Sequence, residues 1–309
     1  MSPASGRWIG TASATLVMAL VVGCTQLPAI GAGALLHPAR HTTRLPTPAG
    51  CSNATFAGAN VTLRGWRCAT QAPRRATIVY LHGVADNRGS AAGPIARFLP
   101  LGYDVITYDS RAHGESSGEA CTYGFYEKQD LHRVIDTIAG PVILIGASLG
   151  GAVALQEASD DPRVTAVVAA ETFSDLRTVA TQRAPWMFTT RQIDQAFQLA
   201  EREARFDVDA VSPERAAGHI AVPVLLIHGD ADVDTPAAHS QRVFDQLKGP
   251  KRLILVPGAT HNRSLRPETW TWIETFVRGA LSEPARITEA PREPRSPTIS
   301  RHGQRGSPA

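Results

Sequence analysis

Ser148 lies in a short turn whose sequence is typical of a nucleophilic serine. The turn reads Gly146-Ala147-Ser148-Leu149-Gly150, a G-x-S-x-G pattern, and it follows an apolar run from Pro141 to Ile145. Small residues then begin a helical pattern. A tight turn from strand to helix holds such a hydroxyl at the carboxyl end of a sheet, near the positive end of the helix dipole. This context favours a nucleophile over a glycine-rich packing turn.

A serine hydroxyl needs a base to remove its proton and a carboxylate to orient that base. Both residue types follow apolar runs later in the chain. After 222–227 (VPVLLI) comes His228-Gly229-Asp230-Ala231-Asp232-Val233-Asp234, and after 252–256 (RLILV) comes Pro257-Gly258-Ala259-Thr260-His261. His261 is the predicted base, because it is the only histidine after the last predicted strand inside the predicted folded region. From the residues alone, all three aspartates are candidates for the acid.

Taken in order, these segments resemble the α/β-hydrolases of the serine-aminopeptidase-like or Bem46-like kind. The resemblance covers about residues 55–281 and rests on the His82-Gly83 turn, the 108–116 segment (YDSRAHGES), the serine turn, the H-G-x-x-D-x-x-x-P loop and the G-x-x-H loop. It implies an α/β-hydrolase fold with the order serine, acid, histidine along the chain. It places the acid at Asp232, which leaves Asp230 and Asp234 as turn or capping residues.

Two backbone N–H groups are expected to form an oxyanion hole, which stabilises the negative oxygen of a tetrahedral intermediate. The N–H of Leu149 directly follows the nucleophile, and the N–H of Val84 stands in the loop after the first predicted parallel strand. His82, Asp109 and His113 are expected to be structural. This chemistry implies neither a metal nor a cofactor, and no cysteine–histidine spacing suggests a metal site.

The elements that must position these residues alternate along the chain. Near-continuous β-branched and aliphatic runs are typical of strands buried on both faces of a parallel sheet. They occur at 76–81, 103–108, 141–145, 164–169, 222–227 and 252–256. Helical patterns occur at 90–99, 126–138, 149–159, 237–247 and 267–281. The alternation predicts an α/β fold with a mostly parallel, doubly wound sheet, in one domain at 51–281.

Residues 172–219 break this alternation, because they contain no buried-strand pattern although 190–205 is amphipathic. We therefore expect a small helical cap over one edge of the sheet. Trp186, Met187 and Phe188 either line the site beneath the cap or pack the cap against the body. No motif in the cap indicates which substrate it selects.

The amino-terminal residues resemble a bacterial lipoprotein signal. Arg7 precedes an apolar run at 9–22, which is shorter than the about 20 residues that a membrane span needs. The run ends in Leu20-Val21-Val22-Gly23-Cys24, which is similar to a lipobox. We expect a signal peptide at 1–23 and a lipid on Cys24. Cleavage near Gly23 without lipidation is the alternative, and it would give a secreted protein.

The flanks of the predicted domain have compositions unlike a packed core. Residues 24–50 are rich in proline, alanine and glycine, which predicts an extended tether from the lipid to the domain. Residues 282–309 combine prolines with scattered charges, and they contain almost no large apolar side chain. Such a segment cannot bury enough surface to offset the entropy of ordering, so we predict a disordered tail.

Export permits disulfides, and three cysteines remain besides Cys24. Cys51 and Cys68 bracket a stretch with strand-like alternation, so a hairpin could bring them to bridging distance. Pairing of either one with Cys121, or three unpaired thiols, stays open at this point.

These observations predict an exported serine hydrolase that acts on carboxylic esters, either small molecules or lipids. It would be anchored through Cys24 on the cell membrane, facing the outside or the periplasm, or else be secreted. The formal net charge of +3 over 309 residues, with scattered arginines, gives no reason to expect nucleic acid as a partner. A peptidase or thioesterase of the same fold, or a non-catalytic lipoprotein binding module, are the alternatives. The oligomeric state is not indicated.

Overall fold

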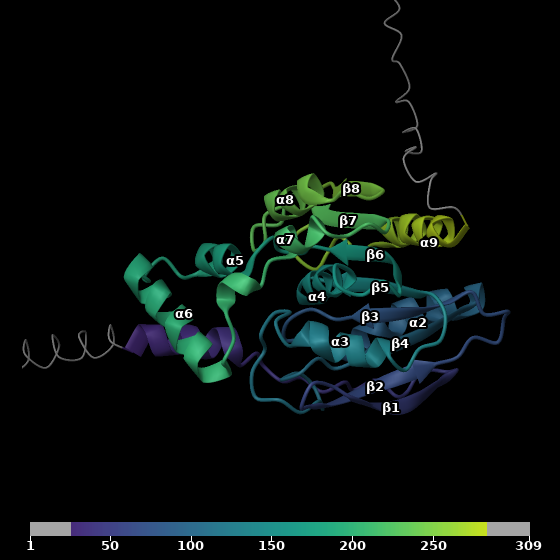
Figure 1. Cartoon of the computed structure of the whole chain (residues 1–309), viewed down its shortest axis with the longest axis horizontal. Helices are drawn as coiled ribbons and strands as arrows, with labels where there is room; N and C mark the ends of the chain where they lie inside the picture. Colours follow the sequence, from purple (N-terminus) through teal and green to yellow (C-terminus); the bar gives the residue numbers. More distant parts are fainter. Residues whose placement is uncertain (1–25, 283–309) are drawn as a thin grey trace, which may run out of the picture.

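The core of the molecule is an eight-stranded sheet in a computed structural model that describes residues 26–282 (Figure 1). The signal peptide, Cys24 and the tail beyond residue 282 lie outside the described residues. The strands run in the order β1-β2-β4-β3-β5-β6-β7-β8. Their bounds are β1 Cys51–Ala57, β2 Thr62–Cys68, β3 Ala76–Leu81, β4 Tyr103–Tyr108, β5 Val142–Ala147, β6 Val164–Ala170, β7 Val224–Gly229 and β8 Lys251–Val256. β1 and β2 pair antiparallel, as do β2 and β4, and all other neighbours are parallel.

Two apolar layers cover the two faces of this sheet. One cluster packs side chains of the strands against α3 (Glu127–Ile135), α4 (Leu149–Ala158), α7 (Pro213–Ala217) and α8 (Ala238–Gln246). The other packs strand residues against α2 (Ala92–Phe98) and α9 (Pro267–Ser282). Strands covered on both faces must be apolar throughout, and every residue of β3 is buried. The predicted doubly wound sheet is therefore confirmed.

The predicted elements correspond closely to the observed ones. Each of the six apolar runs forms a strand whose ends lie within two residues of the prediction. The helical patterns also form helices, although the first of them divides into a 3₁₀ turn, η1 (Arg88–Ala91), and α2. Among the described residues, no helix combines the length and the apolar character needed to cross a bilayer.

The predicted tether at 24–50 is wrong for its described part. Residues 26–36 form a helix, called the amino-terminal helix below, whose Ala32 and Leu36 are buried in a third apolar cluster with Phe197 of the cap. Its glycine- and proline-rich composition gives no helix signal of its own. Helices of this length are marginal alone, and burial of one face against the rest of the protein supplies the stability.

The residues after the amino-terminal helix are also held against the domain. The Arg40 guanidinium donates a 3.0 Å hydrogen bond to the carbonyl of Ser116, and the Asn87 amide donates one of 2.9 Å to the carbonyl of His41. These bonds connect the segment to the loops that follow β3 and β4. The segment is thus part of the hydrolase body rather than a spacer.

The cap consists of α5 (Leu176–Arg183), α6 (Thr190–Ala204), η3 (Val208–Ala210) and α7. α6 begins with a capping box, in which the side chains of Thr189 and Gln192 satisfy each other's backbone N–H. The amino-terminal helix lies beside α6 (Figure 1). A Cβ at Gly31 would approach the Cβ of Ala196 to 3.1 Å, so the lack of a side chain at Gly31 allows the two helices to pack closely.

A disulfide joins the two edge strands. Cys51 and Cys68 are opposite each other in the β1–β2 register and are bridged, whereas Cys121 is buried and unbridged. The bridge closes a loop with a sequence separation of 17 residues. Such a link stabilises the folded state by restricting the unfolded chain.

Removal of this bridge should lower the stability of the domain. For a double Cys51→Ala and Cys68→Ala variant we expect the free energy of unfolding to fall by about 3 kcal/mol, measured by denaturant titration. Dithiothreitol should destabilise the wild-type protein and leave the double variant unaffected. Equal sensitivity of both proteins to the reductant would contradict this role for the bridge.

Candidate active site

Ser148 forms a sharp turn between β5 and α4. Its φ of 50° lies in the left-handed region, where few residues other than glycine are found. A Cβ at Gly146 would come within 2.2 Å of the Gly150 backbone, and one at Gly150 within 2.2 Å of the Leu81 carbonyl oxygen. The two glycines therefore permit the crossing that places Ser148 at the carboxyl end of the sheet. Backbone strain of this kind is common at functional sites.

Three side chains that are far apart in sequence form one chain of hydrogen bonds. The hydroxyl of Ser148 lies 3.1 Å from Nε2 of His261, and Nδ1 of His261 lies 2.7 Å from Oδ2 of Asp232. The Asp232 carboxylate is fully buried and the His261 side chain is 10% exposed. With a proton on Nδ1, His261 donates to the carboxylate and its Nε2 accepts the serine proton.

The carboxylate of Asp232 is held in its charged form. Burial by itself would raise its pKa, but hydrogen bonds from His228, His261 and the backbone N–H of Thr235 prevail and hold that pKa well below its usual value. The other two aspartates of the loop have different positions. Asp230 accepts a 2.6 Å bond from the N–H of Gly258, and Asp234 contributes its own N–H to Asp232.

Glu171, which the sequence analysis did not single out, fixes the loop that carries His261. It directly follows β6, is 1% exposed, and has a φ of 53°. Its carboxylate accepts hydrogen bonds from the backbone N–H groups of Asn262 (2.5 Å), Arg263 (3.0 Å) and Ser264 (2.8 Å). The only signal in the sequence was a charged residue at a strand end, the edge where parallel sheets place their sites.

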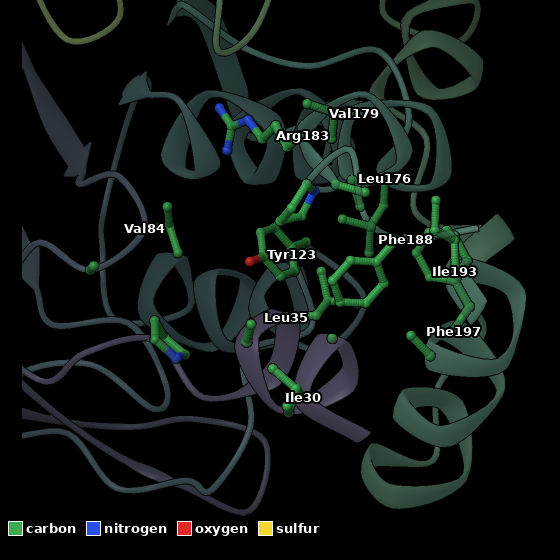
Figure 2. A pocket seen from close by; sticks show the side chains of 18 residues that line it. Ile30, Leu35, Val84, Tyr123, Leu176, Val179, Arg183, Phe188, Ile193 and Phe197 are labelled. Carbon is green, nitrogen blue, oxygen red and sulfur yellow. The ribbon is translucent and has the colours of Figure 1, made fainter. Parts of the chain in front are cut away.

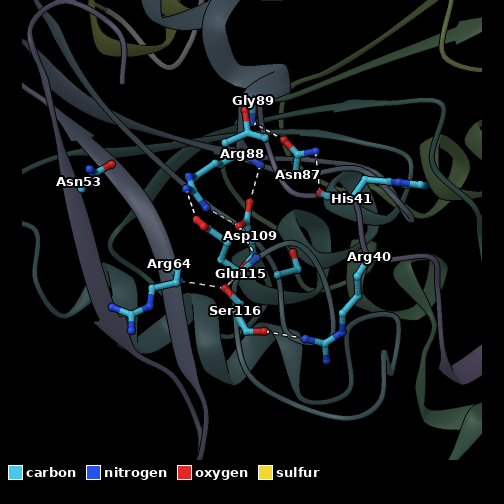
Figure 3. Close-up of polar contacts among 12 residues, drawn as sticks. Arg40, His41, Asn53, Arg64, Asn87, Arg88, Gly89, Asp109, Glu115 and Ser116 are labelled. Carbon is cyan, nitrogen blue, oxygen red and sulfur yellow. Dashed lines mark hydrogen bonds and ion pairs between the residues drawn. The ribbon is translucent and has the colours of Figure 1, made fainter. Parts of the chain in front are cut away.

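The loop that contains Val84 is clamped to the loop after β4 (Figure 3). Arg88 forms a buried ion pair with Asp109, in which its Nη1 lies 2.5 Å from Oδ2, and its backbone N–H donates a 2.7 Å bond to Oδ1 of the same carboxylate. The Asn87 side chain accepts from the N–H of Gly89. Gly83 lies against Ser148, since a Cβ there would be 3.6 Å from the serine Cβ. The clamp thus fixes the loop that follows β3 beside the nucleophile.

His82 and His113 are buried and make structural hydrogen bonds. His82 donates from Nδ1 to the Gly83 carbonyl and accepts at Nε2 from the N–H of Ser110, while His113 donates to the Arg111 carbonyl. Burial lowers the pKa of both imidazoles, that of His113 to about 4. The bond between His82 and Ser110 connects the loops after β3 and β4, whereas His113 holds the second of these loops internally.

A cleft of about 430 Å³ opens at Ser148 and His261, and its walls include Val84, Arg183 and Asp234. Val84 and Arg183 also line a second, apolar cavity beneath the cap. Phe188 lines that cavity, whereas Trp186 is 93% exposed and Met187 is 51% exposed. Only Phe188 of these three cap side chains therefore faces a space beside the site.

One histidine–carboxylate cluster lies away from this cleft. The ligand atoms of His132, Glu157 and Asp161 are within 4.8 Å of one another. Arg163 donates to both carboxylate oxygens of Asp161, at 2.9 and 2.6 Å, and burial raises the pKa of Glu157 to about 7. Arg163 already balances the charge of Asp161, and Nδ1 of His132 lies 2.8 Å from Glu157, so we interpret the cluster as a polar network between α3 and the end of α4.

Replacement of the loop-fixing carboxylate should slow the chemistry of the site. In Glu171→Gln one oxygen becomes an NH₂ group that faces backbone donors, so the His261 loop loses its fixed position. We expect about 10- to 100-fold slower labelling by a fluorophosphonate probe, because small displacements of catalytic groups have effects of this size. Glu268→Gln, an exposed change in the first turn of α9, is the matched control and should label at the wild-type rate. Unchanged labelling of the Glu171 variant would exclude the positioning role.

Known proteins share this architecture. A family model described as alpha/beta hydrolase fold matches residues 76–207. The uncharacterized protein YqkD of Bacillus subtilis is 29% identical over 210 residues, which are 64% of this chain and 69% of that protein. The mitochondrial palmitoyl-protein thioesterase ABHD10 of Mus musculus is 28% identical over 191 residues, which are 56% of this chain and 64% of that protein.

A solved structure extends the match to most of the described chain. The esterase Pf2001 of Pyrococcus furiosus superposes with a TM-score of 0.63 at 22% identity, and the match covers 79% of this chain and 99% of the esterase. At 22% identity, the similarity to this esterase is evidence for a shared fold alone. The strand order, the sharp turn between β5 and α4, and the match to the family model agree with it. This chain therefore has the α/β-hydrolase fold, the fold of the α/β-hydrolase superfamily.

Proposed function

We propose that the protein is an exported serine hydrolase that cleaves carboxylic esters through an acyl-enzyme intermediate. The observation that carries the proposal is the hydrogen-bond chain from Ser148 through His261 to Asp232 at an open cleft. A fold shared with known hydrolases is consistent with it. A binding module would have no need of these three side chains in this arrangement.

Acylation begins when Oγ of Ser148 attacks the ester carbonyl and its proton passes to Nε2 of His261. The N–H groups of Val84 and Leu149 stabilise the oxyanion, and Leu149 is available because the first N–H groups of a helix have no partner within it. The tetrahedral intermediate then collapses. The bond to the alcohol oxygen breaks, and the alcohol leaves with the proton from His261.

Deacylation repeats the sequence with water. His261 removes a proton from a water molecule, and the hydroxide attacks the acyl carbonyl. The bond to Ser148 breaks, the proton returns to its Oγ, and the carboxylic acid is released. Asp232 stabilises the imidazolium in both halves and remains ionised throughout.

Export belongs to the proposal and rests on two observations. The segment Leu20-Val21-Val22-Gly23-Cys24 follows an apolar run and resembles a lipobox. The Cys51–Cys68 bridge is typical of proteins in oxidising compartments. We propose that the mature protein is held on the outer or periplasmic side of the membrane by a lipid on Cys24, or is secreted after cleavage near Gly23.

Loss of the nucleophile should abolish activity. We expect Ser148→Ala to retain the fold, to show no labelling by a fluorophosphonate, and to hydrolyse p-nitrophenyl acetate about 10⁴-fold or more slowly than wild type. Persistent labelling of this variant would refute the assignment of Ser148. A folded wild-type protein that is inert to the probe, to esters and to peptides would instead support the binding module.

The acid can be assigned by comparison of two neighbouring aspartates. Asp232→Asn should lower kcat about 10⁴-fold, because the neutral amide favours the wrong tautomer of His261 and does not stabilise the imidazolium. Asp230→Asn is the control, since that side chain contacts the Gly258 turn. Its kcat should stay within a few-fold of wild type. Similar losses in both variants would mean that the loop conformation, and not the Asp232 charge, matters.

A thioesterase is the second candidate function, because a palmitoyl-protein thioesterase is among the relatives. The same acyl-enzyme chemistry serves both bonds. Parallel kcat/KM measurements on an ester and a thioester of the same acyl chain discriminate between the two. A preference for the thioester by an order of magnitude would favour the second candidate.

A further inference from the structure

An apolar cavity of about 450 Å³ lies beside the catalytic cleft (Figure 2). Its walls come from several parts of the chain that are distant in sequence. The amino-terminal helix contributes Ile30, Ala34 and Leu35, and the cap contributes residues of α5 and α6 together with Phe188. Val84, Ala85 and Tyr123 of the hydrolase body line the rest. A volume of this size is within the range of pockets that enclose small organic ligands.

The cavity adjoins the site of chemistry. Val84 and Arg183 line both the cavity and the cleft that contains Ser148 and His261. In Figure 2 these two residues stand on one side of the cavity, while Ile193 and Phe197 lie at the other end. A chain attached to an acylated Ser148 would have to pass between Val84 and Arg183 to reach the cavity.

The polar cleft and the apolar cavity would hold different halves of an ester, the alcohol and the acyl chain. The leaving alcohol must receive its proton from His261, so it departs through the cleft beside His261, Asn262 and Asp234. In the proposed mechanism the N–H of Val84 binds the carbonyl oxygen, and the remaining substituent of the carbonyl carbon is the acyl chain. The apolar cavity is on the Val84 side.

We propose that this cavity binds the unbranched acyl chain of the substrate, and that the amino-terminal helix is the element that determines chain length. The proposal rests on the proposed ester hydrolase function and names its substrate class as fatty acyl esters. Each methylene that enters the cavity should raise kcat/KM about fourfold until the cavity is filled.

The amino-terminal helix is held as a fixed wall. One face, with Ala32 and Leu36, is buried against the body, and the next face, with Ile30 and Ala34, lines the cavity. After the helix, His37 contacts Glu203 of α6 at 2.7 Å between Nε2 and Oε1. A larger side chain on the face that lines the cavity must therefore either reduce the volume left for the ligand or turn out of the cavity.

The test is a series of p-nitrophenyl esters from acetate to dodecanoate, assayed with the wild-type protein and Ala34→Trp. In the wild type kcat/KM should rise from acetate to octanoate. In Ala34→Trp the ratio of octanoate to acetate should fall at least about tenfold, because the indole occupies the acyl site. Ala180→Trp, on the opposite wall, should reproduce this fall.

Ala29→Trp is the matched control, because Ala29 is exposed on the same helix, as Ala34 is, but does not line the cavity. Its chain-length profile should equal that of wild type. If Ala34→Trp and Ala180→Trp both keep the wild-type dependence of kcat/KM on chain length, the proposal is overturned, even if both variants are fully labelled by the fluorophosphonate.

A second series, acetate esters of increasingly long alcohols, tests which half of the ester enters the cavity. We expect no rise of kcat/KM with alcohol length. A rise that Ala34→Trp removes would assign the cavity to the alcohol and overturn the proposal. A wild-type protein that neither labels with the probe nor hydrolyses acetate would refute the proposed function itself.

Discussion

The hydrogen bond between Asp232 and His261 is the interaction on which the site depends. It joins the loops after β7 and β8, and it holds the imidazole in the orientation that can accept a proton from Ser148. The bond is possible because parallel strands end at one edge of the sheet, so that loops far apart in sequence meet there. Burial strengthens it, since the carboxylate is shielded from water, and the backbone N–H groups of Asp234 and Thr235 donate further hydrogen bonds to it.

The surrounding structure keeps these loops in place by further buried polar contacts. Glu171 binds three backbone N–H groups of the His261 loop, and Arg88 ties the Val84 loop to Asp109. Buried polar contacts of this kind are stronger than exposed ones, because the local dielectric constant is low. The nucleophile itself is in a strained conformation, which the close packing of Gly146 and Gly150 sustains. The fold by itself therefore brings Ser148, His261 and Asp232 to hydrogen-bonding distance.

The chain before the sheet has a larger role than its composition indicates. The amino-terminal helix packs on the cap and forms one wall of the cavity beside Ser148. Its first described residue, Gln26, lies two positions after Cys24, the predicted site of lipidation. A lipid on Cys24 would bring this wall of the cavity next to a membrane surface. An anchored enzyme of this form would meet acyl lipids at the place where they are most concentrated.

The sequence by itself determined the parallel sheet, the turn at Ser148 and the choice of His261, because buried strands and tight turns restrict local composition strongly. The resemblance selected Asp232 from three aspartates, and only the structure shows that its carboxylate is the one that contacts His261. Glu171 and the amino-terminal helix were beyond sequence reasoning. Their positions depend on packing between distant segments, which leaves no periodic pattern at the residues themselves. Tertiary structure alone decided the shape of the cavity beside the nucleophile, for the same reason.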